Sequence, residues 1–158
     1  MEANVKFATA DDIDRLINAR FDYFKADNQK LTSEQHSVIE SNLRQYFKKH
    51  INTDFFAAFI EENGAIISLA FLAISEEPAN LSFPTGKTGT IFNVLTYPEY
   101  RRKGFATLVM HALIEEGKRQ NLSYIELSAT ESGKPVYEKL GFLVKDPSLH
   151  TDMKLSLL

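Results

Sequence analysis

The sequence contains no cysteine, and this absence removes several kinds of chemistry at once. Disulfide bonds, thiolate nucleophiles and thiolate metal ligands are excluded. No stretch approaches the roughly 18 consecutive apolar residues that a membrane-spanning helix needs. The first residues, Met1-Glu2-Ala3-Asn4, lack the basic and then apolar pattern of a secretion signal. We therefore expect a cytoplasmic protein that has no membrane partner.

Positive charge and histidine are also too sparse for two further classes of function. The net charge of −3 argues against a protein that binds nucleic acid by bulk electrostatics. The four histidines are scattered without ligand spacing, so we expect no metal site; they are His36, His50, His111 and His150. The Gly-Lys-Ser/Thr loop of nucleotide hydrolases is missing. With no repeat or linker, residues 1–158 are expected to form a single domain.

The apolar pattern that is present predicts an α/β (α+β) fold, a mixed sheet with helices on both faces. Its first part reads as a strand over residues 5–7, two capped helices over 10–24 and 32–49, and a hairpin. The helix caps are Thr9 with Asp12 and Thr32 with Gln35. The hairpin strands, 55–62 and 65–74, meet at Asn63-Gly64, a strong turn signal.

The second part of the chain alternates strands and helices. An exposed loop over residues 76–89 is expected from its prolines and glycines. Strands are predicted over 90–96, 123–128 and 153–157, with helices over 103–119 and 134–140. In the longer helix we expect one face to be buried, carried by Phe105, Leu108, Val109, Ala112 and Leu113.

A short basic stretch, Arg101-Arg102-Lys103-Gly104-Phe105-Ala106, lies between the strand over 90–96 and the long helix. The first N–H groups of a helix have no intrahelical partner, and the helix dipole places partial positive charge there. Gly104 lets the backbone approach a ligand closely, and the three cations add charge. This arrangement predicts a site for a phosphate-bearing small molecule, although the cations taken alone are equally consistent with a solvated surface cluster.

Residues 93–106 resemble the acetyl-CoA signature of the Gcn5-related N-acetyltransferase (GNAT) superfamily. Arg101, Gly104 and Ala106 match its core pattern of Gln or Arg, two residues, Gly, one residue, then Gly or Ala. A second block, Tyr137-Glu138-Lys139-Leu140-Gly141-Phe142, looks like the late tyrosine and Gly-Phe of the family, and Tyr137 follows Ala106 by 31 residues. The order of the predicted elements also agrees, so the resemblance covers nearly the whole chain.

The resemblance implies a mostly antiparallel sheet in which two strands splay apart to hold acetyl-CoA. Backbone N–H groups from Arg102 through Thr107 would bind the pyrophosphate, a set that includes Lys103, Gly104, Phe105 and Ala106, with the basic side chains, including that of Arg101, at the rim. Backbone groups of Leu95 and Thr96 would pair with the pantetheine. An amine would attack the thioester directly, and Tyr137 would donate a proton to the departing thiolate. Tyr137 packing on the sheet without a chemical role is the alternative.

The sequence departs from the family pattern at several positions. Many relatives have Asn seven residues before the tyrosine, where this chain has Thr130, which is kept as a cofactor-binding candidate. The usual positions of a base on the fourth strand hold Thr90 or Phe92. The base is therefore left open between a water chain, Glu126, Glu131 and loss of the proton to solvent.

These departures leave two functions open. The first is an acetyl-CoA-dependent N-acetyltransferase that acts on a small-molecule or peptide amine of unknown identity. The second is a catalytically silent CoA-binding or acyl-CoA-binding module of the same fold. A homodimer is possible for either, because edge strands could pair with a second copy.

Overall fold

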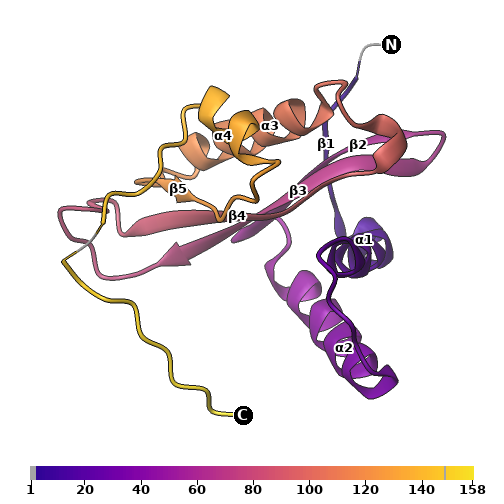
Figure 1. Ribbon diagram of the computed structural model, residues 1–158, viewed down its shortest axis with the longest axis horizontal. Coiled ribbons are helices and arrows are strands. Elements are labelled where there is room, and N and C mark those ends of the chain that lie inside the picture. The colour runs from indigo at the N-terminus through magenta and orange to yellow at the C-terminus, as the bar shows by residue number, and fades with distance from the viewer. Residues whose placement is uncertain (1–2, 148) are drawn as a thin grey trace.

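The computed structural model describes residues 3–147 and 149–158, and a five-stranded sheet is its centre (Figure 1). The strands follow one another in space in chain order, and the first three pairs are antiparallel whereas β4 and β5 are parallel. This arrangement confirms the predicted mixed, mostly antiparallel sheet. The strands are β1 (Lys6–Phe7), β2 (Phe55–Glu62), β3 (Ala65–Glu76), β4 (Lys87–Thr96) and β5 (Ile125–Glu126).

Helices cover both faces of this sheet, as predicted. Figure 1 shows α1 (Ile13–Ala26) and α2 (Ser33–His50) on one face, and α3 (Phe105–Arg119) and α4 (Lys134–Lys139) on the other. Both predicted capping boxes form. Thr9 and Asp12 close a 3-10 turn that leads into α1, and Thr32 and Gln35 close the first turn of α2.

The core is divided by the sheet into two apolar clusters. Phe47, Phe55 and Phe71 centre the cluster under α1 and α2, whereas Val109, Met110 and Leu113 belong to the one under α3. Strand β3 contributes side chains to both clusters because successive side chains point to opposite faces of the sheet. Leu69 and Phe71 belong to the first cluster, and Ala70 and Leu72 belong to the second. Each large side chain that is fully buried contributes about 1.5–3 kcal/mol.

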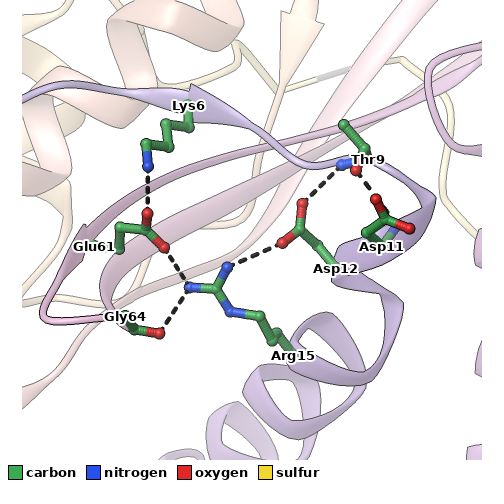
Figure 2. Close-up of polar contacts among 7 residues, drawn as sticks. All are labelled: Lys6, Thr9, Asp11, Asp12, Arg15, Glu61 and Gly64. Carbon is green, nitrogen blue, oxygen red and sulfur yellow. Dashed lines mark hydrogen bonds and ion pairs between the residues drawn. The ribbon is translucent and has the colours of Figure 1, made fainter.

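The β2–β3 hairpin turns where the sequence predicts. Asn63 and Gly64 both have positive φ values, 51° and 80°, as the two central residues of a type I′ turn require. Beside this turn lies a network of charged side chains that joins β1, β2 and α1 (Figure 2). Arg15 is its hub, with hydrogen bonds to Glu61 Oε2 at 2.7 Å, Asp12 Oδ1 at 2.9 Å and the Gly64 carbonyl at 3.2 Å. Glu61 also accepts from Lys6.

Three predicted element boundaries differ in the structure. The loop expected over 76–89 is shorter, because β3 and β4 stay paired out to Glu76 and Lys87. The strand expected over 123–128 is reduced to Ile125 and Glu126, which lie opposite Gly89 and Thr90 of β4, although backbone hydrogen bonds also join Ser123 and Tyr124 to β4. The helix expected from residue 103 begins at Phe105, because Gly104 has a positive φ of 81° that is incompatible with a right-handed helix.

Two other predictions are wrong. Residues 153–157 form no strand, and the side chains of Met153, Leu155 and Leu157 are exposed. Their alternating pattern suits a strand, but a strand also needs a partner, and no strand of the described residues pairs with them. Leu108 is exposed rather than buried, whereas Met110 is buried; the inner face of α3 is centred on Val109, Met110 and Leu113.

Candidate active site

A bulge in β4 shapes the site. Leu95 lies opposite Leu69 and Phe92 opposite Phe71, so the two residues Asn93 and Val94 lie opposite the single residue Ala70. Asn93 adopts a left-handed backbone conformation with φ 54°, which asparagine tolerates better than most residues do. A bulge of this kind bends a strand and increases its twist.

Beyond Thr90, no strand of residues 3–147 and 149–158 pairs with β4 on the side of β5. Its parallel pairing with β5 is limited to Gly89 with Ile125 and Thr90 with Glu126, yet β4 continues to Thr96. Gly89 makes the close approach possible, since an added Cβ would lie 2.8 Å from side-chain atoms of Leu122 and Leu72. The edge of β4 from Ile91 to Thr96 is therefore open, as expected for a splayed strand pair.

Strand alternation decides which backbone groups line this open edge. Tyr97 N donates to Ile67 O at 3.0 Å, so the pair Tyr97–Ile67 is hydrogen-bonded across β3 and β4. Leu95 is directed to β3 in the same way, whereas Thr96 and Val94 direct their backbone groups to the open edge. Of the two residues predicted to pair with pantetheine, Thr96 thus faces the open edge and Leu95 faces β3.

The basic loop follows a 3-10 turn, Pro98–Tyr100, and has two consecutive bends of unusual backbone conformation. Arg102 and Gly104 both have positive φ, 61° and 81°. The first hydrogen bond of α3 runs from Leu108 N to Gly104 O at 3.2 Å. Within the part of the chain that the structure describes, the N–H groups from Arg102 through Thr107 have no acceptor. Successive free N–H groups at a helix N-terminus form an anion-binding concavity.

The side chains of the loop have different surroundings. Arg101, Arg102, Lys103 and Thr107 are exposed, and Phe105 and Ala106 are half-buried. Arg101 Nε donates a 3.0 Å hydrogen bond to the Thr96 carbonyl, so this guanidinium is tied to the end of β4. Lys103 Nζ lies 5.5 Å from the centroid of the Tyr100 ring. Arg102 forms no ion pair with any described residue.

Tyr137 lies on α4, half-buried, with its ring 6.2 Å from that of Phe142. Burial raises the pKa of Tyr137 above its usual value, and the nearby Tyr23 raises it further. Tyr23 belongs to α1 on the opposite face of the sheet.

The remaining candidates are accounted for by local contacts. Thr130 Oγ1 accepts a 3.1 Å hydrogen bond from Gly133 N, which closes the turn that leads into α4. Glu126 is paired with Lys145, and Glu131 is exposed. The fourth strand offers no carboxylate at Thr90 or Phe92.

A residue that the sequence reading missed is Arg20 of α1. Its Nη1 donates to Asn93 Oδ1 at 3.2 Å, which places a guanidinium directly at the bulge. The sequence of this helix shows a capping box and an apolar stripe, and a half-buried arginine adds no periodic pattern to either.

No group of three or more His, Asp or Glu side chains is placed to hold a metal ion in residues 3–147 and 149–158. The same ranges contain no helix that is long and apolar enough to span a membrane.

A cavity of about 930 Å³ lies beside β5. Tyr137 and Ser128 line it, but the basic loop does not. The row of N–H groups in the basic loop is therefore separate from this cavity.

This fold and site define a class, and comparison with known proteins identifies it. The model of the Acetyltransferase (GNAT) family matches residues 13–142, so the chain belongs to this family. Among solved structures, a predicted acetyltransferase from Clostridium acetobutylicum, crystallised with acetyl-CoA, is 30% identical, with a TM-score of 0.82 over 95% of this chain and 96% of that one. A GCN5-related N-acetyltransferase from Ralstonia eutropha JMP134 shares the fold at 21% identity, with a TM-score of 0.78 over 97% and 98% of the two chains.

Curated relatives agree over a shorter stretch. The uncharacterized N-acetyltransferase ycf52 of Porphyra purpurea is 35% identical over 69 residues, which cover 44% of this chain and 39% of that one. The matched stretch is thus well under half of that relative's length. The resemblance seen in the sequence is confirmed, and family and relatives together support acetyl transfer as the general activity.

Proposed function

We propose that this protein transfers an acetyl group from acetyl-CoA to a primary amine. The observation that carries the proposal is the row of unpaired N–H groups from Arg102 through Thr107 at the N-terminus of α3. No acidic residue lies in the first turn of this helix to compete for the site. An anion that bridges several donors, such as a pyrophosphate, suits such a row.

The rest of the cofactor has a place in the same arrangement. From the loop, the open edge of β4 offers the backbone groups of Thr96 and Val94 to an extended chain, as an added strand would use them. The pantetheine arm, which has two amides, matches that pattern. Arg102 and Lys103 add positive charge at the rim, and the relative from Clostridium acetobutylicum was crystallised with acetyl-CoA.

The chemistry then requires three groups near the thioester. The neutral amine attacks the carbonyl carbon, a backbone N–H of the open edge polarises the carbonyl oxygen, and the C–S bond breaks as the new C–N bond forms. Tyr137 donates its phenolic proton to the departing CoA thiolate. The raised pKa keeps Tyr137 protonated at neutral pH. The proton that the amine loses is carried by water to the phenolate, which restores the phenol.

Calorimetry with acetyl-CoA and CoA tests the first step, and CoA release over a panel of amines tests the second. We expect both cofactors to bind and at least one class of amine to be acetylated. Absence of cofactor binding would overturn the proposal at its base. Tight binding without turnover of any amine would instead favour a silent CoA-binding module.

A further inference from the structure

Arg20 occupies an unusual position for a charged side chain. It is half-buried on α1, with its guanidinium carbon 4.6 Å from the centroid of the Phe24 ring and 5.3 Å from that of Phe92. Burial lowers the pKa of this group from its ordinary value, and Tyr23 opposes that effect. The two rings hold the guanidinium plane in place and remove water from around it.

The charge of Arg20 is not neutralised by the protein. No carboxylate among residues 3–147 and 149–158 forms an ion pair with it. The neighbouring Asp22 is engaged elsewhere, because it accepts a 2.6 Å hydrogen bond from the Tyr97 hydroxyl. Of the five guanidinium N–H groups, the one directed to Asn93 has an acceptor in the described structure. Buried cations are normally paired, so the missing partner is a feature to explain.

Asn93 shows the same shortage of acceptors. This side chain is 1% exposed, and its Nδ2 has no hydrogen-bond partner in the described structure. The orientation of the amide is fixed by Arg20, which can only donate and therefore must face the oxygen. An unpaired amide donor thus remains buried beside a half-buried cation, and the described residues supply no acceptor for the amide and no anion for the cation.

Both donors lie where the acceptor amine must approach. Asn93 forms the bulge at the open edge of β4. Arg20 lies on α1 and reaches this bulge through its 3.2 Å hydrogen bond to Asn93 Oδ1. Arg20 therefore approaches the reaction site from the α1 face, opposite the face that carries the basic loop and α3.

We infer that Arg20 binds a carboxylate on the acceptor, so that the substrate is an amine of amino-acid type that carries both groups. This inference rests on the proposed function. A planar guanidinium held between two rings presents its N–H groups as a fork, which matches the two oxygens of a carboxylate.

Matched pairs of acceptors test this inference directly. Amino acids and their primary amides differ in the carboxylate while keeping the amine, and CoA release is measured for each pair with acetyl-CoA. We expect the wild type to prefer the amino acid. R20Q should lower kcat/KM for amino acids by about 10- to 100-fold, the effect of losing hydrogen bonds to a charged group, and change that for amides by less than about twofold. R20K keeps the positive charge but loses the forked guanidinium, so its kcat/KM for amino acids should lie between those of the wild type and R20Q.

A control variant separates the site from general charge. R44Q removes an arginine of α2 that pairs with Asp14 and Glu40, and it should leave the preference unchanged. Thermal unfolding of R20Q and R20K shows whether each variant is folded. Preference of the wild type for amides, or an equal loss for both members of each pair in R20Q, would overturn the inference and leave the proposed function standing.

A binding measurement decides the matter even without turnover. Calorimetry of the CoA complex with N-acetyl amino acids and N-acetyl amino acid amides probes the site through the product. Tighter binding of the acids to the wild type, lost in R20Q, supports the inference, and equal binding of acids and amides overturns it. Failure to bind acetyl-CoA or CoA at all would count against the proposed function instead.

Discussion

Arg101 Nε donates a 3.0 Å hydrogen bond to the backbone carbonyl of Thr96, and so joins the first residue of the basic loop to the last residue of β4. The two parts of the proposed cofactor site, the anion-binding concavity and the open strand edge, are thereby held at a fixed separation. Arg102 and Lys103 have no such tie to a described residue, so in the proposed function they would act on a phosphate through charge alone. The three cations of the loop therefore have different roles.

These roles predict different responses to salt. R101Q should weaken acetyl-CoA binding about fivefold at both low and high ionic strength, because it loosens the loop. R102Q should weaken binding by a similar amount at low salt and by much less near 1 M salt, where charge interactions at the surface are screened. Calorimetry of both variants at two salt concentrations checks this. If the effect of R101Q disappears at high salt as well, Arg101 acts only as a surface charge.

Tyr137 is expected to affect turnover and not cofactor affinity. Y137F removes the proton donor but keeps the ring against Phe142, so kcat should fall about 100-fold while the Kd for CoA changes by less than about twofold. Steady-state kinetics and calorimetry measure the two quantities. Because the pKa of Tyr137 is raised, activity should not decline in the wild type as pH rises from 7 to 9, a range in which the amine loses its proton.

Y46F is the matched control for this prediction. Tyr46 is another half-buried tyrosine whose pKa is raised by burial, but it lies on α2 and stacks on His50 at 4.4 Å. Its loss should leave kcat within about twofold of the wild type. A strong loss of CoA affinity in Y137F with intact kcat would assign Tyr137 to binding and not to acid catalysis.

Local signals in the sequence were sufficient for much of this architecture. Each capping box and the Asn63-Gly64 turn involves residues within three positions of one another, so the pattern contains all the partners that the structure uses. The basic loop is similar, because its function depends on its own backbone and on the helix that follows it. These elements are therefore predictable from short windows.

Features that depend on distant partners were not predictable in the same way. Asn93 read as a polar residue in an apolar strand, and the bulge appears only in the register of β4 against β3. The alternation of Met153, Leu155 and Leu157 matches a strand pattern, but it does not show whether a sheet edge is available to pair with this segment. The surroundings of Arg20 depend on its contacts with Phe92 and Asn93, which lie more than 70 positions later in the chain.

Gly104 gives a direct test of the anion-binding concavity. G104D should reduce CoA affinity by more than about 100-fold, because a carboxylate would take the place of the anion. An added Cβ meets no atom within 4 Å, so steric conflict within the protein does not explain such a loss. G104A is the control: it carries the strain of a positive φ, about 1–2 kcal/mol, without the charge. Calorimetry measures the CoA affinity of both variants. Equal affinities of G104D and G104A would mean that the phosphates bind elsewhere.

The network around Glu61 predicts how stability depends on pH. Hydrogen bonds from Lys6 and Arg15 lower the pKa of Glu61 below its ordinary value of 4.5 (Figure 2). A carboxyl group with a lowered pKa in the folded state adds stability above pH 4.5, and this contribution is lost as pH falls through the folded-state pKa. E61Q should therefore be less stable than the wild type at pH 7, and the difference should shrink below pH 4.5.

Urea denaturation at several pH values measures this difference in the free energy of unfolding. E77Q is the matched control, because Glu77 is exposed in the loop between β3 and β4 and forms no ion pair with a described residue. It should show no comparable loss of stability at pH 7. A constant difference between wild type and E61Q from pH 7 down to pH 3 would mean that Glu61 stabilises the fold by packing, since only the charged form can hold Lys6 and Arg15 as ion pairs.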